Sequence, residues 1–167
     1  LRGIAYLELL INFMPQGYDP AALAVPLVLT SDLLQRPARN TVQEIMTQLE
    51  ADLAVGRAET LIPNAPADPI RLSQSAIAAY QARAAFLRKD WDKAITYAND
   101  AITLSGKTLS IADYPDFFAD ENESETIFKY RNNAIPQILW RDTNGDIFFE
   151  PADKLKDLFD RDNDIRY

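Results

Sequence analysis

Alanines at helical spacing between residues 78 and 106 constrain the fold of this chain more than any other feature. They line one face of each of two successive predicted helices, at Ala78, Ala82, Ala85, Ala94, Ala98 and Ala101. Residues three and four apart share a helix face, so small side chains at this spacing let two antiparallel helices approach closely. Asp90-Trp91 is predicted to make the turn, and Trp91 and Ile95 to fill the interface. The segment predicts a helical hairpin.

The limits of this hairpin follow from residues that begin and end helices. Ser73 is the predicted cap of a first helix over about 74–88, and Gly106 ends a second helix over about 91–105. A Lys-Asp-aromatic turn followed by Ala94 and Ala101 is typical of the second half of a tetratricopeptide repeat. The first-helix positions usually held by Trp and Gly are Ala here. Such a repeat indicates a surface that binds another molecule.

A second amphipathic helix is predicted upstream. Thr41 and Glu44, three residues apart, form a capping box. Apolar residues then recur with helical periodicity at Val42, Ile45, Met46, Leu49 and Leu53. Polar residues, Glu44 and Gln48 among them, fall on the opposite, solvated face.

An N-terminal helix over residues 1–14 is apolar on most sides, which predicts that it is buried. Pro15 and Gly17 end it. The connection over residues 15–40 is long for a compact domain and contains four prolines, so we expect it to be functional or specific to a family. Three more prolines predict a stiff, non-helical linker between residues 63 and 69.

The character of the chain changes after Gly106. Between Thr108 and Phe128 there are six acidic residues, no basic residue and several interleaved aromatic residues, which we expect to pack in a loop. A strand is predicted over 126–131. A β-hairpin follows, with strands at 137–143 and 146–149 around the Asn144-Gly145 turn, and then a short helix over 151–159. The predicted fold is mainly α, with tetratricopeptide-like helical hairpins, a small β-hairpin and long loops.

Charge and composition exclude several classes of function. The net charge of −8 and a sequence pI near 4.5 argue against binding to nucleic acid or anionic lipid. The chain contains no cysteine and no histidine, which rules out disulfides, thiolate chemistry, Ser-His nucleophiles and His-ligated zinc. No run approaches the ~20 apolar residues that span a bilayer. Because the chain starts at Leu1 within a predicted helix, we interpret it as an internal piece of a longer protein.

Motifs from one family occur in order along the chain. Residues 1–10 resemble that family's "LRA-x-AY-x-x-L" helix, and residues 24–29 resemble its "GVPLVL" segment, with Ala24 in place of Gly. Residues 39–45 and 49–53 resemble its "R-x-T-V-x-E-V" and "I-x-x-D-L" helix. Residues 124–128 are similar to "SEVIF", and Leu158-Phe159 with residues 164–167 are similar to "LF…D-x-R-[FY]". The chain thus resembles the SusD/RagB family of outer-membrane nutrient-binding lipoproteins.

This resemblance implies a SusD-like α-α superhelix that bears irregular loops. Residues 1–167 would be a segment of one SusD/RagB-like domain, with helical repeats at 1–106 and the loop, β-hairpin and short helix at 107–167. The implied parent is a surface-exposed outer-membrane lipoprotein. It captures a glycan, or in some relatives a peptide, for a SusC-like TonB-dependent transporter, and the lipid anchor would lie outside this chain. The resemblance also implies that the helical repeats face the transporter.

Two sets of candidate site residues follow. Glycan binding uses aromatic faces with nearby polar groups, so Trp140, Tyr130 and Arg131 are candidate ligand-binding residues; the alternative is that Trp140 packs the hairpin onto the helices. The outer surface of the helices at 41–56 and 74–105 is the candidate transporter contact, with Glu44, Gln48 and Lys93 as its test positions.

Metal binding and catalysis are not predicted. The alternating acids at 160–164 and at 142–146 lack the glycine that an EF-hand loop requires at its sixth position, so we interpret them as solvated turns. No phosphate-binding loop, nucleophile elbow or cofactor motif is present. We therefore expect a binding protein without a cofactor. The alternatives are a cytoplasmic tetratricopeptide adaptor, whose repeats would not be split by a 15–40 loop, and a carbohydrate enzyme with paired carboxylates.

Overall fold

The computed structural model describes residues 1–15, 17–32, 34–65, 68–108, 110–118, 121–130 and 152–159. The chain divides into two compact units, Leu1–Gly106 and Lys107–Tyr167. The first unit contains four helices, α1 (Arg2–Phe13), α2 (Val42–Ala58), α3 (Gln74–Leu87) and α4 (Trp91–Ser105). The described part of the second contains α5 (Tyr114–Phe118) and α6 (Asp153–Lys156). The predicted mainly α fold is confirmed.

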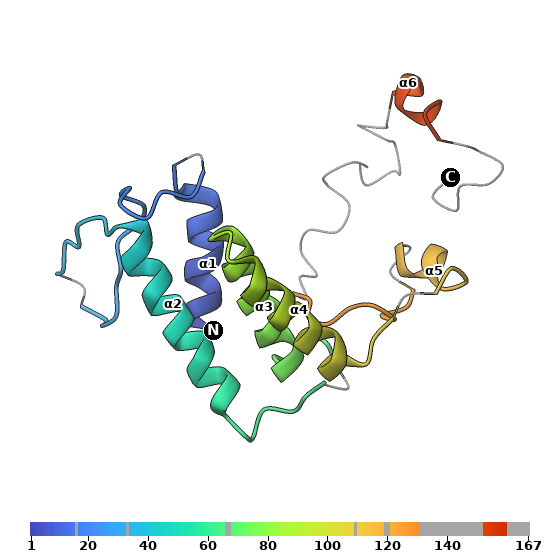
Figure 1. Ribbon diagram of the computed structural model, residues 1–167, viewed down its shortest axis with the longest axis horizontal. Coiled ribbons are helices and arrows are strands. Elements are labelled where there is room, and N and C mark those ends of the chain that lie inside the picture. The colour runs from blue at the N-terminus through green and yellow to red at the C-terminus, as the bar shows by residue number, and fades with distance from the viewer. Residues whose placement is uncertain are drawn as a thin grey trace. The chain divides into compact units, whose positions relative to one another are not determined.

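The first unit consists of two helical pairs. Helix α1 packs beside α2, α3 packs beside α4, and α2 joins the pairs by packing against α3 (Figure 1). The predicted apolar stripe of α2 supplies much of the core, since Val42, Ile45, Met46, Leu49 and Leu53 are at most 4% exposed. At Gly3 the α1 and α2 backbones approach so closely that an added Cβ atom would lie 2.9 Å from the Leu49 carbonyl oxygen.

The first backbone amides of α2 donate hydrogen bonds both to the helix's own capping residue and to the preceding connection. The predicted capping box is present, with the Glu44 amide donating to Thr41 Oγ1 and the Thr41 amide donating to Glu44 Oε2. The amides of Val42 and Gln43, which have no partner within the helix, donate to the carbonyls of Ala22 and Pro20. The connection therefore has a structural role at the start of the helix.

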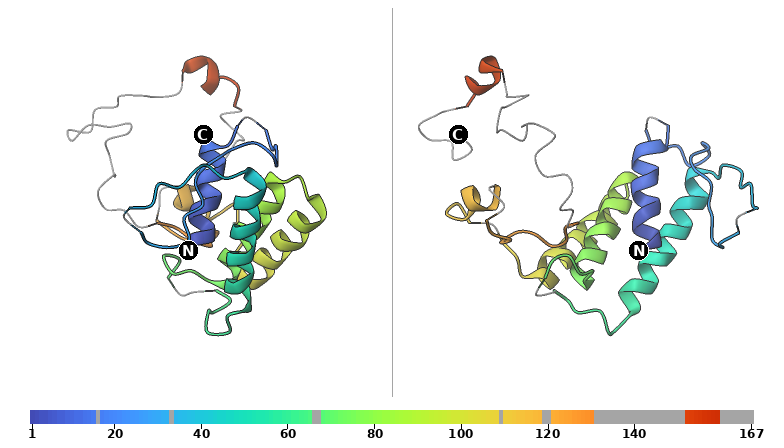
Figure 2. Two further views of the ribbon diagram at one scale, coloured as in Figure 1. Left: turned by 90° about the vertical axis from the view of Figure 1, so that its left-hand side faces the viewer. Right: turned by 180° about the vertical axis from the view of Figure 1, so that it is seen from behind.

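The described residues between 15 and 41 form a strap beside α1 and α2, on the side away from α4 (Figures 1 and 2). The Arg39 guanidinium donates to the carbonyls of Leu23 and Ala24. The Val28 amide donates to the Tyr6 hydroxyl oxygen at 2.6 Å, and the Leu27 amide donates to Asn40 Oδ1 at 2.8 Å. These bonds fix the apolar segment 24–29 against α1 and the start of α2.

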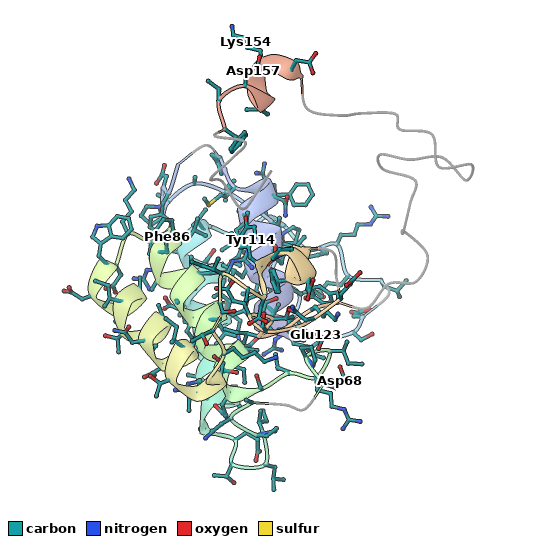
Figure 3. The ribbon with its side chains drawn as sticks, turned by 90° about the vertical axis from the view of Figure 1, so that its right-hand side faces the viewer. Asp68, Phe86, Tyr114, Glu123, Lys154 and Asp157 are labelled. Atoms are coloured by element: carbon teal, nitrogen blue, oxygen red, sulfur yellow. The ribbon has the colours of Figure 1, made fainter. Side chains whose placement is uncertain are left out.

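The α3–α4 hairpin has the predicted limits, with Ser73 and Asp90 as side-chain caps and Gly106 left-handed at the end of α4. The prediction that Trp91 and Ile95 fill the helix interface is wrong, since their side chains are 52% and 61% exposed. The alanines bring the helices together closely and leave little room for larger groups. Trp91 instead packs edge-on against the Phe86 ring, with centroids 5.4 Å apart. Phe86 lies on α3 near this turn (Figure 3).

Helix α1 is less buried than its composition predicted. Ile4, Tyr6, Leu7 and Leu10 are buried, as expected for the face toward α2 and the strap. On its other side the prediction is wrong: Leu9, Ile11 and Phe13 are exposed in this chain. An apolar sequence specifies that a helix can be buried on all sides, but only the neighbouring elements decide how many sides are covered.

The second unit differs from its predictions in three places. Residues 114–118 form the short helix α5 instead of a loop, and Pro115 fits its first turn. In the turn just before α5, the Ser110 hydroxyl accepts from the Asp113 amide. Residues 126–130 are irregular, so the predicted 126–131 strand is wrong for its described residues. The predicted helix at 151–159 is helical only over Asp153–Lys156. The β-hairpin predicted at 137–149 lies outside the described residues.

Candidate functional site

A groove of about 360 Å³ lies between α2, α3 and α4. Helix α3 forms its floor, because α3 packs against both of the other helices. Thr47, Glu50, Ala51 and Ala54 line it from α2, and Lys93 and Tyr97 line it from α4. The residues on the floor, Ala84 and Ala85, are small, which leaves the space open.

Two ion pairs join the three helices that form this groove. The Arg88 guanidinium at the end of α3 donates from one nitrogen to both carboxylate oxygens of Glu50, at 2.6 and 2.8 Å. Seven residues along α2, Arg57 reaches Asp100 on α4 at 3.1 Å. The pKa of Arg88 is raised, mainly by the hydrogen bond with Glu50. Glu50 and Arg57 of α2 are thus each paired with a residue of opposite charge on α3 or α4.

The predicted contact residues Glu44 and Gln48 lie one turn apart on α2, on a stripe next to the groove wall. Glu44 belongs to the capping box, and the Thr41 backbone amide is the main reason that its pKa is lowered. Gln48 donates to Asp52 Oδ1 at 2.8 Å. Asp52 in turn accepts two hydrogen bonds from Arg2 on α1. Glu44 therefore also stabilises the start of α2, and Gln48 bonds the carboxylate that links α2 to α1.

Lys93 lies on the groove wall itself. Its ammonium group is 3.1 Å from the carboxylate of Asp90, the cap of α4, and the pKa of Asp90 is lowered mainly by this hydrogen bond. The Lys93 side chain remains 60% exposed. Lys93 is thus available at the surface, and of the three predicted contact residues it is the one that lines the groove.

The candidate ligand residues are only partly described. The Tyr130 side chain is 71% exposed, and its ring packs edge-on against Phe128 with centroids 5.2 Å apart. Glu123, which is labelled in Figure 3, pairs with Lys129 at 2.6 Å. Arg131 and Trp140 lie outside the described residues. A ligand site at these three positions stays a prediction.

The same limit applies to the acidic strings at 142–146 and 160–164, which lie outside the described residues. Within the described residues, no group of three or more acidic side chains is placed to hold a metal ion. None of the described helices is long and apolar enough to cross a bilayer.

Sequence analysis missed Gln81 and Tyr97. Gln81 lines the groove from α3, and its Oε1 atom is buried without a hydrogen-bond partner among the described residues. Tyr97, four residues after Lys93, lies on the same face of α4. The only hint in the sequence was polar residues at helical spacing next to the alanines, which does not indicate how three helices meet.

The solved structures that are similar to this chain include two SusD superfamily proteins. One is a SusD superfamily protein from Bacteroides thetaiotaomicron VPI-5482, with a TM-score of 0.67 and 26% identity over 76% of this chain and 28% of that protein. The other is a SusD superfamily protein from Bacteroides fragilis, with a TM-score of 0.62 and 26% identity over 76% of this chain and 30% of that protein. No protein-family model and no curated protein matches the sequence.

These similarities confirm the resemblance to the SusD/RagB family that the ordered motifs predicted, and they confirm a SusD-like helical fold. The chain spans less than a third of the length of either solved structure. The prediction that residues 1–167 are a segment of one SusD/RagB-like domain stays a prediction.

Proposed function

We propose that this chain is part of a non-catalytic nutrient-binding component of an outer-membrane uptake system. The parent protein would be a surface-exposed lipoprotein, anchored by lipid outside this chain. It would capture a ligand, a glycan in the first instance, and hand it to a SusC-like TonB-dependent transporter. The mechanism is capture and release, with no bond chemistry and no cofactor.

The observation that carries this proposal is the structural similarity to two SusD superfamily proteins at TM-scores of 0.67 and 0.62. The contacts inside the first unit support it, because residues from three of the quoted motifs meet there. Tyr6 of the first motif bonds Val28 of the second, and Arg39 of the third bonds the carbonyl of Ala24. A tetratricopeptide adaptor of uninterrupted repeats would not contain a strap between its first two helices.

We propose that the transporter contact lies on the outer surface of the helices at 41–56 and 74–105, which are α2, α3 and α4. Charge changes there test the assignment. Glu44→Lys, Gln48→Lys and Lys93→Glu in the full-length parent should each weaken transporter association about tenfold, as expected for the loss of about 1.4 kcal/mol of binding energy. The measurement is co-purification of the transporter from detergent-solubilised outer membranes.

Thr41→Ala is the matched control for Glu44→Lys, because it damages the same helix cap without changing the charge. It should leave transporter recovery unchanged. Equal recovery of the transporter with all three charge variants would place the contact elsewhere. Recovery of the parent only in the soluble fraction, with cytosolic partners, would favour the adaptor instead. Turnover of glycans by the purified parent would favour an enzyme.

A further inference from the structure

A second groove, of about 330 Å³, lies between α1, α3 and α4, and its lining is almost wholly apolar. Ile11 lines it from α1, and Phe86, which is labelled in Figure 3, lines it from α3. Both of these large side chains are exposed, at 41% and 65%. Three alanines also line the groove, at positions 82, 94 and 98. Their small side chains leave space that the side chains of another element can fill.

An exposed apolar stripe on α4 continues this groove. Trp91, Ile95 and Ile102 are 52%, 61% and 58% exposed, and their spacing of four and seven residues places them on one side of the helix. Ala98 lies between Ile95 and Ile102 on that side, and it lines the groove. The Trp91 ring contacts Phe86 across the turn. We call Ile11, Phe86 and the stripe the apolar face.

The apolar face is distinct from the surface that carries Lys93. Residues two apart on a helix point about 200° away from each other, so Ile95 lies opposite Lys93 and Tyr97 on α4. The fully solvated side of α4 is polar, with Asp92, Thr96 and Asn99 exposed. The exposed isoleucines are therefore confined to the side next to the groove, as expected for a surface that another element covers.

The way in which helical repeats stack indicates what covers this face. Each repeat buries its apolar surface against its neighbours, and the last repeat of an array has a polar outer surface because it faces water. Helix α4 is the last helix of the first unit, yet it exposes a tryptophan and two isoleucines. It therefore has the surface of an internal repeat and not that of a terminal one.

We propose that the apolar face binds an amphipathic helix of the parent protein, contributed by sequence outside residues 1–167. This inference rests on the proposed function, which makes the chain part of a longer protein. The two similar SusD superfamily structures are long enough to supply such a helix, since this chain spans 28% and 30% of them.

Charge and shape both favour an apolar helix side as the occupant. Arg83 is the charged residue that lines the groove, and it is already paired with Glu8 on α1 at 2.7 Å. No unpaired charge of the lining residues is thus left to attract a charged ligand. Alanines on α3 and α4 allow a further helix to approach closely, as the alanines between these two helices do. Its apolar residues would recur three and four apart.

The first test measures whether position 95 is covered in the parent. The chain contains no cysteine, so Ile95→Cys and Ile102→Cys introduce unique thiols into this segment. Their reaction with a water-soluble maleimide, followed by mass spectrometry of the labelled peptide, should be at least roughly tenfold slower in the parent than in the 167-residue chain, since a covered thiol reacts only when the structure opens. The parent is purified without its transporter.

Thr96→Cys is the matched control, because it lies on the polar side of the same helix at an exposed position. Its thiol should react at the same rate in the parent and in the 167-residue chain. Equal rates in the two proteins for Ile95→Cys and Ile102→Cys would overturn the proposal, since the apolar face would then be open in the parent as well.

The second test identifies the occupant. Ile95 in the parent is replaced by the photoreactive p-benzoylphenylalanine, and the crosslinked peptides are sequenced by mass spectrometry. We expect a crosslink within one molecule, to a peptide outside residues 1–167 with apolar residues at helical spacing. Crosslinks between two copies, or confined to residues 1–167, would overturn the proposal.

The two proposals can fail separately. A parent that recovers the transporter but leaves position 95 open would refute the helix on the apolar face alone. A parent that protects position 95 but recovers no transporter would refute the proposed function alone.

Discussion

At the scale of single residues, the turn between α3 and α4 holds an unusual backbone conformation. Lys89 has a φ of 62°, in the left-handed region that favours glycine. The conformation lets the amide of Asp90 donate to the Ala85 carbonyl, and Asp90 then caps α4. The turn therefore needs this geometry, although lysine is not the residue best suited to it.

Lys89→Gly should stabilise the chain. A residue with a Cβ atom in the left-handed region costs ~1–2 kcal/mol, and the greater freedom of glycine in the unfolded chain offsets part of that gain. We expect a net increase of about 0.5–1 kcal/mol in the free energy of unfolding, measured by urea denaturation. Thr103→Gly, at an exposed position inside α4, is the control and should lower it by roughly 0.3–0.5 kcal/mol, the difference in helix propensity between the two residues. Loss of stability with Lys89→Gly would mean that the lysine side chain contributes more than the strain costs.

At the scale of the elements, helix ends are stabilised by residues far away in the sequence. The strap bonds the first amides of α2, and the side-chain amide of Gln74 donates to the carbonyls of Gly56 and Glu59 at the other end of that helix. The α1–α2 pair is linked in the same way, because Arg2 donates to both carboxylate oxygens of Asp52 at 2.7 and 2.6 Å.

The Arg2–Asp52 pair should make stability depend on pH. The hydrogen bond from Arg2 is the main cause of the lowered pKa of Asp52 in the folded chain. The pair therefore stabilises the fold at pH values above the unfolded pKa, about 3.9, and this contribution is lost as the pH falls through the lower folded value. Asp52→Asn should cost at most about 1 kcal/mol at pH 7, because the Arg2 side chain is 47% exposed.

The measurement for Asp52→Asn is the midpoint of urea denaturation at pH 7 and at pH 3. The difference between the variant and the original chain should shrink at pH 3. Glu125→Gln, at an exposed position, is the control, and its urea midpoint at pH 7 should equal that of the original chain. A difference that is as large at pH 3 as at pH 7 would assign the effect to packing and not to charge.

At the scale of the whole molecule, the core lies within the first unit. All the buried apolar side chains in the described part of the chain fall between Ile4 and Ala101. The contacts between residues also separate the chain into two units, and the first of these ends at Gly106. The first unit thus contains the apolar interior that is required for independent folding.

A fragment of residues 1–106 should therefore fold by itself. We expect its melting temperature to lie within about 4 °C of the whole chain, the shift that roughly 1 kcal/mol gives in a domain of this size. Circular dichroism of the fragment and of the whole chain gives the comparison. An unfolded fragment would mean that residues after 106 complete the core of the first unit.

Local sequence determined the helices of the first unit. Periodicity located them, and Thr41, Ser73 and Gly106 marked their ends, because caps and repeats of apolar residues act over a few neighbouring positions. The ordered motifs also indicated the SusD-like fold. Exposure was predicted less well: Trp91 was expected inside the helix interface and lies largely outside it.

Only the tertiary structure determined the long-range contacts of these helices and the groove between them. It joined the strap to α1 through Val28 and Tyr6, and it bonded Arg39 to Ala24 within the strap. It also placed Gln81 and Tyr97 in a groove with Lys93. The physical reason is distance along the chain: these contacts join residues that local preferences cannot relate. Alanine spacing determines that two helices can approach closely, whereas the packing of α2 against α3 determines where an open groove and an unpaired amide remain.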